Sequence, residues 1–167
     1  MHELIEKRRS IRKYKPGAPV TKEQLDQLLG AAMLAPSAHN SRPWEFIVVT
    51  KREMLDEIAR VHPHAKMMET ASAAIVVVAI PQTDKIAGFF PQDCGAATQN
   101  ILLEAVNLGL GTCWCGILPV DDLVATFRRL FAIGEPKIPF CVIAVGTPDH
   151  APNQKGFFDE SKVTYLV

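Results

Sequence analysis

A cluster of cations near the start of the chain is the first feature that could do chemistry. The sequence KRRSIRK, residues 7–13, holds five Lys and Arg residues in seven positions. Such a cluster repels itself unless a negative group lies against it. Arg8, Ser10 and Arg12 alternate, so their side chains point the same way if the segment is extended. Two guanidinium groups and a hydroxyl on one side can hold a phosphate monoester, although a solvated basic helix end explains the same residues.

A second feature is the sequence APSAHNSRPWEFIVV, residues 35–49. Small and amide residues lie between two prolines and lead into a strand, as in a rigid loop whose backbone and amides meet a flat polar ligand. His39 could act as a base, but no nucleophile elbow accompanies it, so an exposed loop histidine is the simpler interpretation. We expect Trp44 to lie in the core rather than to stack on a ligand.

Alternating helices and strands must position these two stretches. A capping box at residues 21–24 begins one helix, whose apolar face holds Leu25, Leu28, Leu29, Ala32 and Met33. The sequence predicts strands at 44–50, 73–80 and 139–148, with a lone strand-like tail at 162–167. It predicts further helices at 2–9, 51–61 and 92–110, the last apolar all round and therefore buried, and one from Asp121 or Asp122 to Phe131. Gly109 and Gly111 are expected to end the long helix.

Length and composition indicate one α/β or α+β domain over residues 1–167, with a sheet of about four strands. No dinucleotide-binding glycine fingerprint or phosphate-binding loop is present. Lys plus Arg equals Asp plus Glu, at 18 each, so no overall field attracts nucleic acid or anionic membrane. The longest apolar run, residues 71–80, is too short to span a bilayer, and the charged N-terminus is unlike a signal peptide. We therefore expect a cytoplasmic protein.

The four cysteines do not form a convincing metal set. Cys113 and Cys115 have one residue between them, and no second Cys or His pair flanks them at the spacing of a zinc site. Buried free thiols in a reducing cytoplasm are the expected state.

Four segments together resemble the flavin-dependent nitroreductase family, in its compact branch. They are RRSIRKY, APSAHNSRPWEFIVV, QDCGAATQNILLEAVNLGLGTCWCGI and PFCVIAVGTP, in the order and approximate spacing of that family. The resemblance implies an α+β fold with a central mixed sheet flanked by helices. It also implies an intertwined homodimer with FMN bound at two sites in the subunit interface.

The resemblance also implies roles for particular residues. Phosphate and ribityl contacts are expected from Arg8, Arg9 and Ser10, and Arg12 is expected near N1 and O2 of the flavin ring. The backbone of Cys115, Gly116 and Ile117 is expected against the ring, with an N–H directed at N5. The flavin of the partner subunit is expected to meet Pro36, Ser37, Ala38 and Asn40.

The sequence departs from the family pattern in three places. Many relatives carry Lys-x-Arg in the C-terminal connector, whereas only Lys155 is kept here. The Gln that usually follows one residue after the P-S-A-x-N motif is Arg42 here. An amide that often contacts the ring must be replaced by His64 or Lys66, and the sequence does not decide between them.

The function implied is reduction of nitroaromatics, quinones or related electron-poor compounds, with NADH or NADPH as electron donor and two-electron ping-pong transfer. Alternatives are another task on the same fold, such as flavin cleavage or reductive dehalogenation, or a flavin-binding protein without turnover. A nucleic-acid binder that uses the basic cluster is a further alternative. No nucleic acid or membrane partner is expected. The tail is expected to add to the other subunit's sheet edge. Neither the physiological acceptor nor the nicotinamide donor follows from the residues.

Overall fold

A four-stranded antiparallel sheet forms the middle layer of the chain. The computed structural model describes residues 3–81, 88–150, 156 and 158–166. The strands are β1 (Trp44–Val49), β2 (Ala73–Ala79), β3 (Gly111–Gly116) and β4 (Ile138–Gly146), in the order β1-β2-β4-β3. Every pair of neighbouring strands is antiparallel. A mixed sheet also contains parallel pairing. Among the described residues, the parallel pairing is a single bridge between Ser10 and Thr112.

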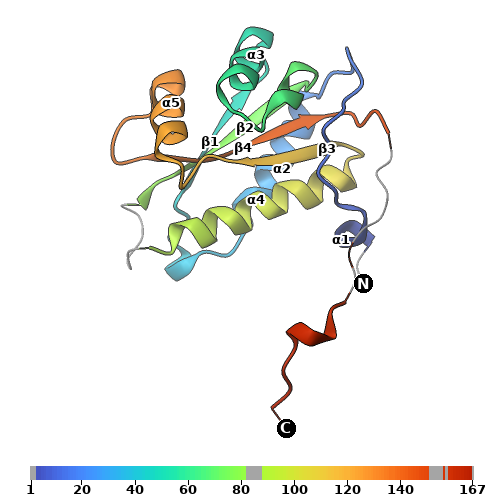
Figure 1. Ribbon diagram of the computed structural model, residues 1–167, viewed down its shortest axis with the longest axis vertical. Helices are drawn as coiled ribbons and strands as arrows, with labels where there is room; N and C mark the ends of the chain where they lie inside the picture. Colours follow the sequence, from blue (N-terminus) through green and yellow to red (C-terminus); the bar gives the residue numbers. More distant parts are fainter. Residues whose placement is uncertain (1–2, 82–87, 151–155, 157, 167) are drawn as a thin grey trace.

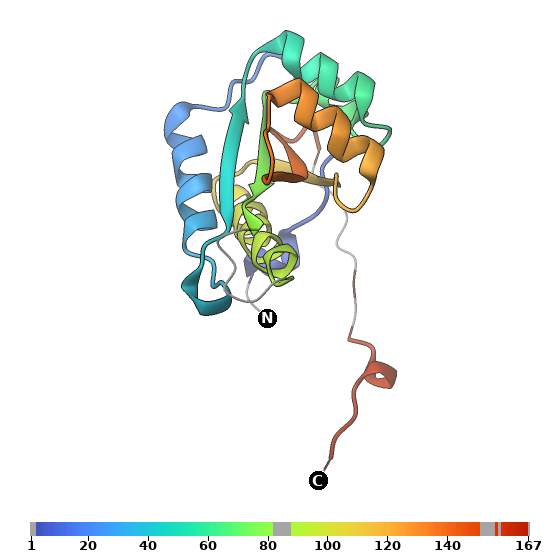
Figure 2. The ribbon, with the colours of Figure 1, turned by 90° about the vertical axis from the view of Figure 1, so that its left-hand side faces the viewer.

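Helices cover both faces of the sheet, as Figures 1 and 2 show. One face carries α2 (Lys22–Met33) and α4 (Phe90–Asn107), and the other carries α3 (Arg52–Val61) and α5 (Asp121–Phe131). The predicted capping box is confirmed, because the Thr21 hydroxyl accepts from the Gln24 N–H and the Gln24 side chain accepts from the Thr21 N–H.

The two central strands divide the apolar residues between two cores. All seven residues of β2 are buried, which is typical of a strand covered on both faces. Successive side chains point to opposite faces. Ala74, Val76 and Val78 therefore join the core under α3 and α5, whereas Ile75 and Val77 join the core under α2 and α4.

The N-terminal segment reaches the sheet through two buried side chains. The short helix α1 (Glu3–Lys7) ends, and the chain then runs extended past the beginning of β3. Ile11 and Tyr14 are buried, with 5% and 3% of their surface exposed. The Ile11 N–H donates to the Thr112 carbonyl at 2.8 Å, and the Tyr14 hydroxyl donates to the Ile11 carbonyl at 2.8 Å. This segment is therefore fixed to the sheet rather than free in solvent.

Several sequence-based boundaries were wrong. No strand was expected at β3, and Gly111 begins this strand rather than ending a helix. The long helix spans Phe90–Asn107 rather than 92–110, but Gly109 ends it as predicted, because this glycine follows the C-cap Leu108 with a φ of +69° and donates its N–H to the Val106 carbonyl at 3.1 Å. Met33 is 52% exposed, although it was assigned to a buried face. Neither Asp121 nor Asp122 caps α5, because Val120 is its N-cap; both carboxylates instead lie in the first turn, where they suit the helix dipole.

Helix α4 is buried on one side only. Cys94, Ala97, Ile101 and Ala105 face the sheet, while Gln99 and Asn107 are exposed. The expectation of a helix buried all round is therefore wrong for a single chain, because neither α2 nor the sheet covers its outer face. No helix in the described part of the chain is long and apolar enough to cross a membrane.

The described tail, residues 158–166, forms no strand within its own chain. It contains one short turn, Glu160–Lys162, and runs away from the helices and the sheet (Figures 1 and 2). Its apolar side chains lie open to solvent, with Phe158 73%, Tyr165 72% and Leu166 96% exposed. Such side chains gain stability only when another surface covers them.

Candidate functional site

Of the three residues predicted to alternate in the basic segment, Ser10 and Arg12 are exposed as expected, whereas Arg8 is half-buried at the end of α1. The Arg8 N–H closes α1 by donating to the Leu4 carbonyl at 3.0 Å, and the following residues are extended. Ile11 points inward, whereas Ser10 and Arg12 are exposed. The extended backbone therefore places Ser10 and Arg12 on the side away from the core.

A cavity of about 570 Å³ gathers three of the predicted ring ligands. Arg12, His64 and Lys66 line it together, although they come from two segments about 50 positions apart. Glu69 and Asp149 also line it, so the cavity carries both signs of charge. The structure thus brings both candidates for the missing amide, His64 and Lys66, close to Arg12.

Gly116 has a backbone N–H that faces away from the sheet. The Ile117 N–H donates to the Phe140 carbonyl at 3.1 Å, so it faces β4. Hydrogen-bonding direction alternates along an antiparallel strand, so the Cys115 N–H also faces β4 and the Gly116 N–H faces the open edge of β3. Of the three predicted backbone contacts, only Gly116 has an N–H directed away from the sheet.

Neither the packing nor the backbone conformation of this chain requires a glycine at position 116. A Cβ atom added there would meet only the Leu118 carbonyl oxygen, at an ordinary 3.8 Å. Its φ also lies outside the range that favours glycine, so neither packing nor backbone conformation requires one. A glycine in this position leaves the edge open to a closely approaching planar ligand.

The side chain of Cys115 points to the core rather than to the site. Its Sγ atom donates to the His64 carbonyl at 3.4 Å, and the residue is 4% exposed. A shared hydrogen bond with the Cys113 thiol, together with burial, raises the pKa of the Cys115 thiol. Cys115 therefore stays a neutral thiol, and its side chain is directed away from the cavity. All four cysteines are free and buried, as predicted.

His62 was not predicted, and it connects two parts of the site. Its Nε2 atom lies 2.9 Å from the Gly116 carbonyl oxygen, and its Nδ1 atom lies 3.1 Å from the His64 backbone nitrogen. Only 1% of its surface is exposed, and this burial lowers the pKa of its imidazole. A histidine that directly follows a helix gives no sequence signal for such a role.

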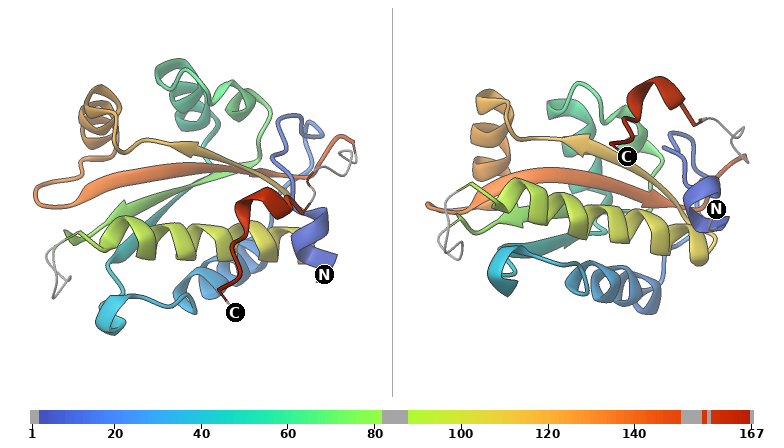
Figure 3. Two further views of the ribbon diagram at one scale, coloured as in Figure 1. Left: turned by 60° about the horizontal axis from the view of Figure 1, so that its bottom comes forward. Right: turned by 90° about the horizontal axis from the view of Figure 1, so that it is seen from below.

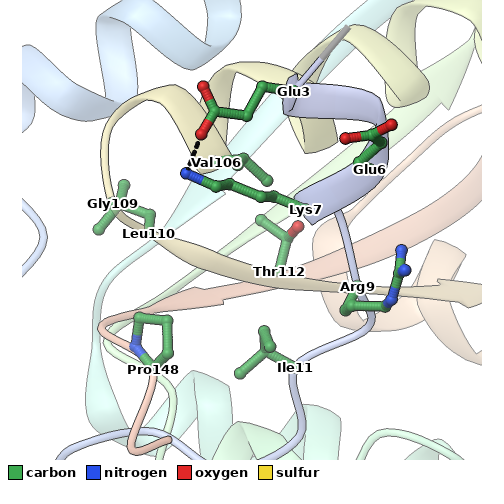
Figure 4. A pocket seen from close by; sticks show the side chains of 10 residues that line it. All are labelled: Glu3, Glu6, Lys7, Arg9, Ile11, Val106, Gly109, Leu110, Thr112 and Pro148. Carbon is green, nitrogen blue, oxygen red and sulfur yellow. Dashed lines mark ion pairs between the residues drawn. The ribbon is translucent and has the colours of Figure 1, made fainter. Parts of the chain in front are cut away.

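Arg9 lies in a different cavity from Arg12. Figure 4 shows it beside α1, the end of α4 and the beginning of β3. The Arg9 Nη1 atom donates to the Arg8 carbonyl at 2.6 Å, and Lys7 pairs with Glu3. Because Glu3 and Glu6 line the same cavity, its charge is mixed. The structure therefore does not bring all the predicted phosphate ligands into one cavity of a single chain.

The loop that follows α2 is held rigidly. His39, Asn40 and Arg42 all have positive φ values, between 50° and 54°. The Arg42 N–H donates to the Ser37 hydroxyl oxygen at 2.9 Å, and the Ala38 N–H donates to Oδ1 of buried Asp93 at 3.0 Å. Exposed Pro36 begins the loop and exposed Asn40 lies within it. These bonds fix the loop as a preformed surface, as the sequence predicted.

The loop and the basic segment lie at opposite ends of α4. Asp93, in the first turn of this helix, holds the loop, while Val106, near its end, lines the cavity of Arg9. Thirteen residues of helix separate them, or about 20 Å along the axis. Figure 3 shows the loop and α1 far apart in both views. One chain cannot place both groups around one small ligand. The position of Lys155 lies outside the described residues.

The fold and the sequence both match known proteins. The sequence model of the Nitroreductase family matches residues 5–68 and 59–147, so it covers most of the chain. The chain belongs to the nitroreductase family. The predicted family and enzyme class, an oxidoreductase of the nitroreductase type, are thereby confirmed.

Individual nitroreductase-family proteins are similar over nearly their whole length. A protein of Methanothermobacter thermautotrophicus, provisionally named an NADH dehydrogenase/NAD(P)H nitroreductase, is 48% identical over 96% of this chain and 84% of its own. An FMN-dependent nitroreductase from Clostridium difficile R20291 is 32% identical, with a TM-score of 0.90 over 99% of this chain and 98% of its own. A Desulfovibrio desulfuricans protein, provisionally called a nitroreductase and solved with FMN, is 26% identical, with a TM-score of 0.84 over 99% and 95%.

Proposed function

We propose that two copies of this chain bind FMN and catalyse the NAD(P)H-dependent reduction of nitroaromatics, quinones or related electron-poor compounds. Family membership and the names of the relatives support the reaction class. The structural observation that carries the proposal is the outward-facing Gly116 N–H at the edge of β3, which His62 connects to His64 in the cavity that Arg12 and Lys66 also line.

The residues present fit FMN chemically. A planar ring needs an open backbone edge, which Gly116 supplies, and a polar pyrimidine rim needs donors, which Arg12, Lys66 and His64 supply. When bound, FMN supplies the redox chemistry, accepting a hydride from the nicotinamide and passing two electrons to the acceptor. No protein nucleophile is needed.

Each group of residues then has its own task. Arg8 and Ser10 hold the phosphate and the ribityl chain. Arg12 places a fixed positive charge at the pyrimidine rim, which favours a ring that has gained negative charge. Arg9 is assigned to the phosphate through the family pattern. In a single chain it instead lines the neighbouring cavity.

The site is completed by the second copy. The family resemblance assigns Pro36, Ser37, Ala38 and Asn40 to FMN, but in one chain their loop is held at Asp93, about 20 Å along α4 from Val106 beside the basic segment. A two-fold related copy supplies the missing loop to each site. The uncovered outer face of α4 and the exposed apolar tail give the two copies surfaces to bury. Free buried cysteines suit a reducing compartment, which favours the cytoplasm.

A flavin titration tests this function. Apoprotein is titrated with FMN and with riboflavin, and the loaded protein is then mixed anaerobically with NADH or NADPH. We expect tight binding of FMN, weaker binding of riboflavin and rapid bleaching of the flavin, followed by recovery of colour on addition of a nitroaromatic or a quinone. FMN binding without bleaching would indicate a flavin-binding protein that lacks turnover.

A further inference from the structure

The side chain of His62 has both ring nitrogens engaged although the residue is buried. Nδ1 lies 3.1 Å from the His64 backbone nitrogen and accepts a hydrogen bond from the His64 N–H. A neutral imidazole carries one proton, so that proton is on Nε2, which donates to the Gly116 carbonyl at 2.9 Å. The contact with Gly116 spans 54 positions of the chain, whereas the contact with His64 is local, two positions away.

The imidazole is itself held in place. The His62 N–H donates to the Ile58 carbonyl at 3.0 Å, which fixes the backbone at the end of α3. Phe127 of α5 contacts the ring edge-on, with centroids 6.1 Å apart and planes at 88°. The imidazole of His64 also lies beside it, with ring centroids 6.3 Å apart. Two helices on the same face of the sheet therefore set the position of the two ring nitrogens.

The bond to Gly116 decides what the edge of β3 offers to a ligand. In a strand, the N–H and the carbonyl of one residue point to the same side. The Gly116 carbonyl would therefore compete with its N–H for a ligand at the open edge. Because His62 occupies the carbonyl, the edge presents a donor alone. The second bond fixes the beginning of the segment that carries His64 and Lys66 relative to this same edge.

We propose that His62 is a positioning residue, which blocks the Gly116 carbonyl and ties the His64–Lys66 segment to the edge of β3, so that both meet the flavin ring in one fixed geometry. This inference rests on the proposed placement of FMN. An apolar core side chain would fill the same space, but it would leave the Gly116 carbonyl and the His64 N–H without these partners.

Two substitutions separate the two hydrogen bonds. His62→Asn keeps an acceptor near the position of Nδ1 and loses the donor to Gly116. His62→Gln keeps a donor near the position of Nε2 and loses the acceptor for His64. His62→Phe removes both. Ile58→Val serves as the matched control, because this residue is fully buried in the same core and the change costs stability without touching either bond.

The experiment measures the midpoint potential of bound FMN, the rate of its reduction by NAD(P)H and the dissociation constant of FMN. We expect His62→Asn and His62→Phe to slow flavin reduction roughly tenfold and to shift the midpoint, since a buried hydrogen bond contributes on the order of one factor of ten. His62→Gln should keep the midpoint of the wild type and bind FMN several-fold more weakly. Ile58→Val should leave the midpoint potential, the reduction rate and the dissociation constant of FMN unchanged.

Amide hydrogen exchange in the apoprotein gives a readout that does not depend on FMN. The His64 N–H should exchange slowly in the wild type and in His62→Asn, and faster in His62→Gln and His62→Phe. Unchanged exchange together with an unchanged midpoint in all three variants would overturn the inference. A wild type that shows the exchange pattern but fails to bind FMN would keep the His62 contacts and instead reject the proposed function.

Discussion

Gly111 lies directly opposite Gly146 where β3 pairs with β4, and the two glycines make room for the basic segment. A Cβ atom at position 111 would come within 2.8 Å of Ile11 Cγ1, and one at position 146 within 2.8 Å of Tyr14 Cδ1. Ile11 and Tyr14 are the residues that anchor this segment to the sheet. The glycine pair therefore lets Ile11 and Tyr14 pack against the sheet, which fixes the positions of Ser10 and Arg12 between and beside them.

Gly111→Ala should destabilise the fold and weaken FMN binding together. The added methyl group overlaps a branched side chain that cannot move away easily, and overpacking of this kind costs about 1–3 kcal/mol. Urea unfolding, with and without FMN, measures both effects. Gly30→Ala is the control, because nothing lies within 4 Å of the added atom and the helix α2 gains about 1 kcal/mol. A stable Gly111→Ala variant would contradict the anchoring role.

Gly116→Ala should weaken FMN binding without destabilising the fold. The protein has space for this methyl group, so the free energy of unfolding of the apoprotein should change by less than about 0.5 kcal/mol. FMN affinity should nevertheless fall at least tenfold, because the new methyl group stands at the edge where the ring approaches. Isothermal titration with FMN and apoprotein unfolding measure the two quantities. Unchanged affinity would place the ring elsewhere.

Local signals predicted most of the fold correctly. The capping box at Thr21 predicted the beginning of α2, and the apolar run around Val76 predicted a central strand. β3 was missed because GTCWCG contains two glycines and follows Gly109 closely, so its strand character comes from pairing with β4. Non-local pairing of this kind leaves no local signal.

Sequence motifs predicted the candidate site residues, but not the contacts and distances between them. Alternation in RRSIR predicted the outward positions of Ser10 and Arg12, which the structure shows. The role of His62 depends on a contact across 54 positions, so no local pattern could reveal it. The separation of the loop at Ser37 from Arg12 follows from the length of α4 and appears only when the fold is known.

Arg12→Gln should change redox behaviour more than binding. A guanidinium beside the pyrimidine rim interacts more strongly with a ring that has gained negative charge, and only that difference shifts the potential. We expect a lower midpoint potential, by about 30 mV for a difference of ~1.4 kcal/mol, and slower reduction by NAD(P)H. Arg8→Ala should instead lose FMN affinity with little change in midpoint. A spectroelectrochemical titration at saturating FMN compares the two variants. Equal midpoint potentials in Arg12→Gln and wild type would show that Arg12 does not tune the flavin.

Acid should destabilise the protein partly through His62. Burial lowers the pKa of this imidazole in the folded state below its ordinary value of 6.5, whereas the unfolded chain keeps the ordinary value. Unfolding therefore takes up a proton below about pH 6.5. As the pH decreases below this value, the free energy of unfolding decreases by at most about 1.4 kcal/mol per pH unit for this one proton. His64 is the other titratable ring beside it, and the Cys115 thiol is neutral. Urea unfolding between pH 5 and 8 should show a weaker pH dependence in His62→Asn than in wild type. Equal slopes would show that His62 titrates normally.

A complementation experiment tests the central claim, that each FMN site is built from two chains. One variant carries Arg8→Ala and Arg12→Ala. The other carries Ser37→Ala and Asn40→Gly, the glycine being suited to the positive φ at position 40. Each variant alone should bind FMN poorly. Unfolded together at equal amounts and refolded, half of the dimers are mixed and each mixed dimer holds one intact site, so about one quarter of the wild-type FMN sites should return. Recovery of no sites from the mixture, with both variants folded, would contradict a site shared between two copies.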